Sequence, residues 1–403
     1  MLSGNTWGSG AYHSILNYCA LSNNTSFQGG GAWNCTLNHC TLSGNCACGS
    51  GSWGAGPWGG GAYGSTLNNC NLSGNSAVNQ SDAAGSIAYG GGAAACTLNN
   101  CIVSGNFASG PFWPNYDSTY GGGAWNCTLN NCTLMNNSAN GNYGYGGGAY
   151  ECSLNNCAVM GNSAAGYAGG AYGCTLKSCT LAGNSVIGAG SYCTLINCIA
   201  YFNVGGNYDS SCSLLYCCTT PQPTNGLGNI GDAPLFANQP GGNLRLQSNS
   251  PCINAGNNTF ALAGTDLDGS PRIVGGTVDI GAYEFPSPGS IISYAWLQQY
   301  GLPTDGSADY ADPDGDGVDN WHEWLAGSNP TSRFSSPAQL TIIRSGPNVI
   351  LTWPTNAVGF TLQSASSLTS VWSINPSLPI VIGAQNTVTN PVSGPKAFYR
   401  LSK

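Results

Sequence analysis

A short unit that contains a cysteine at a fixed position recurs nine times in the first half of the chain, and this repetition constrains the fold more than any other feature. Its best-preserved copy runs from Gly29 to Asn45, and successive copies start roughly 19–31 residues apart. Such repetition indicates a solenoid, because one unit cannot bury its own apolar face. The second cysteine of the unit is at Cys19, Cys40, Cys70, Cys101, Cys132, Cys157, Cys179, Cys198 and Cys217.

Apolar positions within the unit alternate, which predicts short strands. Cys35 alternates with Leu37 and Cys40 with Leu42, and two polar residues separate the pairs. Period-two alternation indicates short strands joined by tight bends, and no apolar position recurs with helical spacing. The leucine three residues before the second cysteine is present in every copy, at Leu16, Leu37, Leu67, Leu98, Leu129, Leu154, Leu176, Leu195 and Leu214. We therefore expect an all-β fold, with a right-handed parallel β-helix over residues 1–220.

In such a fold each repeat forms one coil, and like residues lie above one another. Coils about 4.8 Å apart would give a rod roughly 40 Å long with leucine columns inside. An asparagine five residues after the second cysteine, such as Asn45, would hydrogen-bond along its column or adopt left-handed backbone at a corner. Gly29, Gly30 and Gly31 suit a bend where backbones approach closely.

The repeats resemble those of bacterial polymorphic outer-membrane proteins and related surface β-helices, which carry corners of the Gly-Gly-Ala-Ile and Phe-x-x-Asn types. Here Ala32-Trp33 replaces Ala-Ile, and Cys-x-Leu and Leu-Ser-Gly-Asn replace other parts of the pattern. The resemblance covers about residues 1–220. It implies the fold and says little about activity.

Charge is scarce in the repeats, and this narrows the function. Charged residues make up 6% of the chain, against roughly 25% in average domains. No arginine precedes Arg245, and the net charge is −8, which argues against a nucleic-acid partner. No apolar run reaches the length of a transmembrane segment. Polysaccharide lyases and glycoside hydrolases need carboxylate pairs or a base with Arg or Lys, and only Asp82 and Asp117 form a candidate pair.

Three long segments between repeats carry the candidate ligand-binding residues. They cover residues 46–58, 76–89 and 107–120, and stacking of the coils would bring their bases side by side. Exposed aromatic rings suit sugars, although they also stack on one another without a ligand. The candidate residues are Trp53, Trp58, Phe112, Trp113 and Tyr116.

A second aromatic set follows the corner alanine of each repeat. If that alanine points inward, the rings form an outward column, whereas alternation with Cys35 places Trp33 inside. The sequence leaves both directions open. The set consists of Tyr12, Trp33, Tyr63, Trp125, Tyr150, Tyr172 and Tyr192.

The chain's 20 cysteines have two interpretations. Stacked cysteines serve as small apolar core residues with free thiols, or they form disulfides between coils in an oxidising compartment. Cys46 and Cys48 lie in a loop and would pair locally. A zinc site is not expected, because the pairs repeat along a column instead of converging with histidines.

Residues 221–286 lose the repeat and predict a closing cap. Pro234, Pro251 and Pro271 cannot continue a ladder of backbone hydrogen bonds. Residues 250–256, 265–272 and 278–284 resemble the segment that closes bacterial choice-of-anchor Q β-helix proteins, which implies a secreted or surface-attached protein. Asp266 and Asp268 suit a tight turn or a bound cation.

Residues 287–333 read as a linker that contains a calcium loop between two short helices, the first over residues 291–300. Residues 312–323 fit the EF-hand loop pattern D-x-D-x-D-G-x5-E. Calcium takes six to eight oxygen ligands, and Gly317 permits the sharp turn. The segment resembles single EF-hand-like and thrombospondin-type-3-like loops, and it predicts a structural Ca²⁺. The predicted ligands are Asp312, Asp314, Asp316, the Val318 carbonyl, Asn320 and Glu323.

Residues 334–403 alternate in strand fashion with turn residues every 8–12 positions, which predicts a small β-sandwich. The expected strands are 339–343, 349–353, 360–363, 371–374 and 397–401. This region resembles the fibronectin-like C-terminal modules of secreted bacterial proteins.

The first residues match the middle of a repeat, since residues 1–5 align with residues 41–45. We therefore expect a truncated N-terminus, so that the missing signal peptide does not indicate location. An open first coil would allow head-to-tail self-association. We expect a secreted or cell-surface structural or adhesive protein without catalysis, with glycans or matrix components as partners. The alternative is a carbohydrate-binding or polysaccharide-degrading β-helix protein that uses the three long segments.

Overall fold

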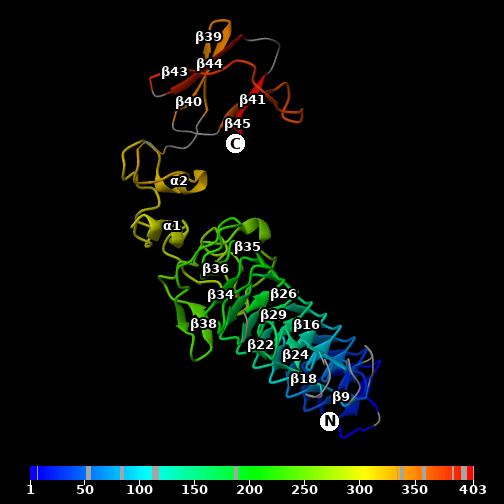
Figure 1. Cartoon of the computed structure of the whole chain (residues 1–403). Coiled ribbons are helices and arrows are strands. Elements are labelled where there is room, and N and C mark those ends of the chain that lie inside the picture. Colours follow the sequence, from blue (N-terminus) through cyan, green and yellow to red (C-terminus); the bar gives the residue numbers. More distant parts are fainter. Residues whose placement is uncertain are drawn as a thin grey trace. The chain divides into compact units, whose positions relative to one another are not determined.

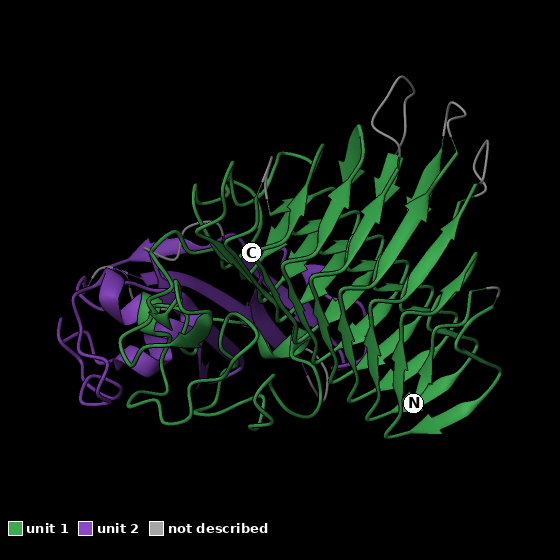
Figure 2. Cartoon of the chain, turned by 90° about the horizontal axis from the view of Figure 1, so that it is seen from below, with its two compact units in different colours: residues 1–295 green, residues 296–403 purple. Residues whose placement is uncertain are grey.

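A computed structural model describes the chain except residues 7, 51–55, 82–85, 111–117, 186–188, 334, 336–339, 356–359, 384, 392–396 and 403. The chain divides into two compact units, Met1–Ala295 and Trp296–Lys403 (Figure 2). Strands dominate both units. No helix among the described residues is long and apolar enough to span a membrane.

Three long parallel sheets form most of the first unit, and each complete coil adds one strand to each of them (Figure 1). Sheet A contains β1 (Leu2–Ser3), β4 (Ala20–Ser22), β8 (Thr41–Ser43), β12 (Asn71–Ser73), β17 (Ile102–Ser104), β22 (Thr133–Met135), β27 (Ala158–Met160), β31 (Thr180–Ala182), β34 (Ile199–Tyr201) and β36 (Cys218–Thr219). Sheet B contains β2 (Ala11–Tyr12), β6 (Ala32–Trp33), β10 (Ala62–Tyr63), β15 (Ala93–Ala94), β20 (Ala124–Trp125), β25 (Ala149–Tyr150), β29 (Ala171–Tyr172) and β32 (Gly190–Ser191). Sheet C contains β3 (Ile15–Asn17), β7 (Thr36–Asn38), β11 (Thr66–Asn68), β16 (Thr97–Asn99), β21 (Thr128–Asn130), β26 (Ser153–Asn155), β30 (Thr175–Lys177), β33 (Thr194–Ile196) and β35 (Ser213–Leu215).

The register of these sheets confirms the predicted parallel β-helix. Leu67 of β11 pairs with Leu37 and Leu98 of the neighbouring coils, and Leu72 of β12 pairs with Leu42. All of these leucines are fully buried. Each contributes roughly 1.5–3 kcal/mol of transfer free energy, as an upper estimate. Like residues therefore form the columns that the repeat predicts.

Each coil turns at corners. At each corner, a residue with left-handed backbone conformation precedes a residue whose side chain points into the core. In the second coil these residues are Asn34, His39 and Gly44, with φ of 50°, 53° and 62°, and they precede Cys35, Cys40 and Asn45. Asparagine and glycine adopt this conformation at the lowest cost. The corner prediction for Asn45 itself was wrong, because its neighbour Gly44 takes the left-handed backbone and Asn45 is buried. The same reversal lets Ala32 and Cys35 both point inward, so that Trp33 lies on the outside.

Side chains that point inward at these corners form hydrogen bonds with backbone groups of the preceding coil. Asn75 donates its backbone N–H and its Nδ2 to Oδ1 of Asn106, both at 2.9 Å. Asn106 Nδ2 in turn donates to the Leu72 carbonyl at 2.9 Å. The cysteines do the same more weakly, as where the Cys40 N–H donates to Cys70 Sγ at 3.3 Å. Repetition thus pairs polar groups that a corner would otherwise leave buried and unsatisfied.

The long segments between repeats contain strands, which corrects their interpretation as loops. Sheet D contains β5 (Thr25–Ser26), β9 (Cys46–Gly49), β13 (Ser76–Asn79), β18 (Phe107–Ser109), β23 (Ser138–Asn140) and β28 (Ser163–Ala164), and sheet E contains β14 (Ile87–Tyr89), β19 (Ser118–Tyr120) and β24 (Tyr143–Tyr145). Ala47, Ala77, Ala88 and Ala108 form a small buried cluster between these sheets. Alternation over three or four residues was too short to distinguish these strands from loops.

Residues after the last repeat close the C-terminal end of the β-helix and cover part of its side. The Cys217 N–H donates to Asn229 Oδ1 at 2.9 Å, so Asn229 takes the place of the next coil. Further along, β37 (Phe236–Asn238) and β38 (Asn243–Leu246) form a hairpin, and η1 (Asn258–Phe260) follows. Ile253 and Ile280 pack with Ile199 of sheet A in one buried cluster. This segment therefore covers the last strands of sheet A.

Two short helices and a β-sandwich complete the chain. Helix α1 (Tyr294–Gln299) lies within the predicted helix at residues 291–300. Helix α2 (Asn320–Ala326) begins inside the predicted calcium loop and ends with the residues predicted to be helical after it. The sandwich has one sheet of β39 (Thr341–Ser345), β40 (Asn348–Pro354), β44 (Gln385–Pro391) and β43 (Ile380–Ile382), and one of β42 (Ser373–Ile374), β41 (Thr361–Ala365) and β45 (Phe398–Ser402). Its core contains Leu351, Trp353, Leu362 and Val388. The sequence interpretation missed β43 and β44.

Candidate functional site

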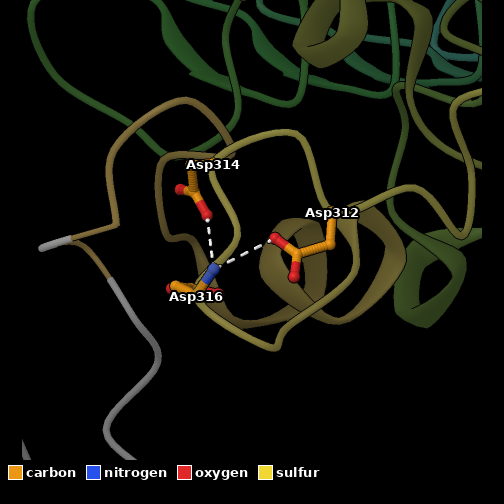
Figure 3. Close-up of side chains that lie close together, drawn as sticks. All are labelled: Asp312, Asp314 and Asp316. Carbon is orange, nitrogen blue, oxygen red and sulfur yellow. Dashed lines mark hydrogen bonds between the residues drawn. The ribbon is translucent and has the colours of Figure 1, made fainter.

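Three carboxylates of the predicted calcium loop converge. Ligand atoms of Asp312, Asp314 and Asp316 all lie within 4.8 Å of one another (Figure 3). The loop backbone holds them, because the Asp316 N–H donates to Oδ1 of Asp312 at 3.2 Å and of Asp314 at 3.1 Å. Gly315 and Gly317 donate to the Asp312 carboxylate at 2.9 Å, and both have positive φ.

Helix α2 positions the remaining side-chain ligands of the motif. Asp319 caps its N-terminus by accepting the His322 N–H at 2.9 Å, and Gly327 ends it in left-handed conformation. Asn320 and Glu323 in the first turn of α2 are both fully buried. The Glu323 carboxylate lies outside the group of three aspartates. In the loop between the aspartates and α2, the Val318 N–H donates to Asp316 Oδ1 at 2.9 Å.

Buried oxygens in this loop lack hydrogen-bond donors among the described residues. They are Asp314 Oδ2, Asn320 Oδ1 and Glu323 Oε2. Asn320 directs its Nδ2 to the Ala308 carbonyl at 2.7 Å, and Glu323 Oε1 accepts from Ser328 Oγ at 3.0 Å, so one oxygen of each remains free. Unpaired buried oxygens are costly, and a cation satisfies them. The donor set, all oxygen, fits Ca²⁺.

The pKa shifts of the acidic residues in the loop also favour a bound cation. Burial, reinforced by the fields of the three aspartates, raises the pKa of Glu323 to about 7. Burial and the charges of Asp316 and Asp312 raise the pKa of Asp314. The backbone N–H groups, that of Gly317 first, lower the pKa of Asp312. The site therefore gathers negative charge at a cost that a divalent cation would remove.

Most of the predicted ligand-binding aromatics lie outside the described residues, namely Trp53, Phe112, Trp113 and Tyr116, as do Asp82 and Asp117. Trp58 is described, and it is half-buried against Tyr63, Tyr89 and Trp125, with ring centroids 5.4–5.9 Å apart. Its Nε1 is buried without an acceptor among the described residues. Trp58 therefore packs between the neighbours of Ala94, a position of the sheet B column without an aromatic ring. Ser191 is a second such position, because it pairs with Tyr172 where the sequence predicted Tyr192.

A column of tyrosines that the sequence interpretation missed runs beside sheet B. Tyr89, Tyr120, Tyr145 and Tyr167 stack at 5.4–5.5 Å with interplanar angles of 11–16°. Their ring faces are therefore occupied by one another, which leaves mainly ring edges for solvent. Sugar rings stack on exposed aromatic faces, so this column favours mutual packing over carbohydrate binding. The signal was the tyrosine or tryptophan just before the glycines of each repeat.

The described thiols of both cysteine columns are free, which decides between the two interpretations. Each bonds within the protein, as where Cys127 Sγ donates to the Trp125 carbonyl at 3.2 Å and accepts the Cys96 N–H at 3.3 Å. Burial raises the pKa of Cys127. The raised pKa makes the Cys127 thiol unreactive, because the thiolate is the reactive form. Cys46 and Cys48 form a disulfide, in β9 instead of a loop.

A buried acidic cluster in the closing segment was also missed, although its residues belong to the motif quoted above. Arg272 Nη2 donates to the Asp279 carbonyl at 3.0 Å and lies 3.8 Å from Glu284 Oε2. Burial raises the pKa of Asp279 to about 7 and that of Glu284 to about 8. Asp266 accepts three backbone N–H groups, including that of Ser270 at 2.8 Å, which matches the turn role. Asp268 pairs with Arg245.

Comparison with known proteins gives little beyond the fold. No protein-family model matches the chain, and no curated protein matches it. Among solved structures, the crystal structure of pectate lyase Pel9A aligns with 66% of this chain and 72% of its own, at 11% sequence identity and a TM-score of 0.30. A likeness this weak transfers no activity or residue role.

Proposed function

We propose that the chain is a non-catalytic structural or adhesive protein of the cell surface or extracellular space, with a structural Ca²⁺ in residues 312–323. The observation that carries the calcium proposal is the convergence of Asp312, Asp314 and Asp316 beside buried oxygens without donors. The bound ion would supply the positive charge that these oxygens lack. Glu323, at the start of α2, would tie the loop to the helix.

The rod supports the structural part of the proposal. Its inward asparagines hydrogen-bond from coil to coil, and its described aromatic rings largely face one another. Such a surface gives no support for a sugar-cleaving site. The proposed partners are glycans or matrix components, and self-association through the first coil is a further proposal.

Calcium binding is tested by titrating the full chain with Ca²⁺ in a calorimeter, and by melting and digesting it with and without a chelator. We expect saturable binding, a lower melting temperature after chelation, and faster proteolysis within residues 305–330. Asp314→Asn should weaken binding, whereas Asp305→Asn, an exposed acid outside the loop, should not. An unchanged melt and digest after chelation would remove calcium from the proposal.

The absence of catalysis is tested separately with a panel of acidic and neutral polysaccharides. We expect no turnover. Turnover that is lost in Asp82→Ala or Asp117→Ala would overturn the structural role and establish the lyase or hydrolase alternative.

A further inference from the structure

The outer face of sheet C carries two columns of small polar side chains, here called the Thr–Asn face. The first column begins after Ile15, and the second ends at Asn155, before Lys177. Strand pairing aligns the members of each column from coil to coil. The first column consists of Thr36, Thr66, Thr97, Thr128, Ser153, Thr175, Thr194 and Ser213, and the second of Asn17, Asn38, Asn68, Asn99, Asn130 and Asn155. Thr97 and Thr128 are exposed, and the face repeats without a gap over these coils.

The asparagine side chains of this face are held in fixed positions by hydrogen bonds to one another. Asn99 Nδ2 donates to Asn68 Oδ1 at 2.9 Å, and Asn130 Nδ2 donates to Asn99 Oδ1 at 2.9 Å. The same bond recurs along the column at 2.8–2.9 Å. Strand geometry then spaces like groups by about 4.8 Å between coils and about 6.6 Å between the two columns. The result is a regular two-dimensional array of hydroxyl, methyl and amide groups.

Sheet A shows that the fold does not require this regularity. The first residue of its exposed strands also points outward, yet it is Ala20, Thr41, Asn71, Ile102 and Thr133 in successive coils. Threonine has the same strand propensity in either sheet, so local preference does not explain why only sheet C keeps it. The last strands of sheet A are covered by the closing segment, whereas the strands of sheet C keep exposed or half-buried outer residues.

The chemistry of the Thr–Asn face suits an ordered, uncharged partner. Its strands from β3 to β26 contain neither a charged residue nor an aromatic ring. It therefore lacks both the charges that bind polyelectrolytes and the ring faces that bind sugars. Methyl groups order the adjacent water, and hydroxyl and amide groups hydrogen-bond it. The spacing between coils is close to the shortest lattice repeat of oxygen atoms in the basal plane of hexagonal ice.

We propose that the Thr–Asn face binds the surface of ice. A preformed array loses little conformational freedom on binding, so many weak hydrogen bonds and van der Waals contacts add up. The proposal rests on the adhesive role described above and names the surface to which the rod adheres. It does not involve the calcium loop.

The test measures thermal hysteresis, inhibition of ice recrystallisation and partition into a growing ice hemisphere, with the full chain in calcium-containing buffer. We expect all three activities in the parent chain. Changing both Thr97→Tyr and Thr128→Tyr should remove most of the hysteresis and of the partition into ice, because two bulky rings lift the face from the lattice. The matched control changes Thr41→Tyr and Thr133→Tyr on sheet A and should keep both.

Circular dichroism and melting temperature verify folding, and a second variant, Thr97→Lys with Thr128→Lys, replaces the first if that one unfolds. Three results would overturn the proposal. The first is that the parent chain has no ice activity, and the second is that the sheet A control loses as much activity as the sheet C variant. The third is that the parent chain binds insoluble cellulose or chitin instead of ice and that the sheet C variant loses this binding. None of these alters the calcium titration or the polysaccharide turnover assay, so the two proposals fail separately.

Discussion

The interior of the rod and the loop at residues 312–323 both bury polar groups, but they differ in whether those groups have hydrogen-bond partners within the chain. In the rod, a buried amide such as Asn106 finds its partners one coil away, because the next repeat presents the same group at the same height. In the loop no repeat exists, and Asp314, Asn320 and Glu323 keep oxygens without donors. Repetition makes the rod self-sufficient, whereas the loop, under the calcium proposal, would need a bound ion to satisfy these oxygens. The rod should therefore be indifferent to calcium and sensitive to any broken column.

Breaking the asparagine column should have the largest effect. Asn106→Ala leaves the Asn75 N–H and Nδ2 without an acceptor and removes the Nδ2 donor of the Leu72 carbonyl, which keeps its ladder bond. At about 1–3 kcal/mol for each of the two buried unsatisfied groups, the loss should be roughly 2–6 kcal/mol in unfolding free energy. Urea denaturation of the full chain measures it.

The control is Asn99→Ala on the outer face of sheet C, where solvent replaces the lost bonds. It should cost about 1 kcal/mol or less. Equal destabilisation by the two variants would show that the buried asparagine column contributes no more to the unfolding free energy than the exposed one.

The closing segment should make the first unit sensitive to pH. Asp279 and Glu284 have folded pKa values raised to about 7 and about 8, with Arg272 and Asp266 beside them. A raised carboxyl pKa means that the folded state binds more protons than the unfolded state. Stability should thus decline as pH rises from about 4 through 8, the window between the unfolded and folded values. Melting temperatures across this range check it, and Glu284→Gln should flatten the slope.

Calcium should reverse the sign of one substitution in the loop. With chelator at pH 8, Glu323 is a buried charge above its raised pKa of about 7, so Glu323→Gln should raise the melting temperature of the second unit. With Ca²⁺ at about 100 times its dissociation constant, the parent gains about 2.7 kcal/mol, which the variant should largely lose. Calorimetric melts in both buffers measure this, and a change of the same sign in both would exclude Glu323 as a ligand.

Cysteine to serine changes in the rod should have the smallest effect. Ser65 already occupies this column and accepts the Cys35 N–H at 3.0 Å, as a cysteine does elsewhere. Cys127→Ser should therefore change stability by about 1 kcal/mol or less, whereas Cys127→Ala leaves the Cys96 N–H unpaired at about 1–3 kcal/mol. Urea midpoints compare them, and a larger loss for serine than for alanine would contradict this role.

Much of the fold was predictable from residues that repeat. The leucine at positions such as Leu67 predicted the register of sheets A and C, and the glycines of the D-x-D-x-D-G pattern predicted the loop that brings Asp312, Asp314 and Asp316 together. Strands such as β9 and β14 escaped because alternation over three or four residues carries too little information. The buried cluster of Arg272, Asp279 and Glu284 escaped because burial of charge depends on what packs over it.

A periodic chain specifies stacking by its own pattern, since identical residues at fixed intervals admit one register in which apolar side chains share a column. The chain's order alone thus fixed the coil, the leucine core and the acidic loop. Three-dimensional packing settled the direction of Trp33, the free state of the thiols, the pairing of tyrosine faces and the exposure of the Thr–Asn face. Those properties depend on how left-handed corner residues turn the backbone and on which surfaces the closing segment covers, and neither is encoded in the spacing of one residue type.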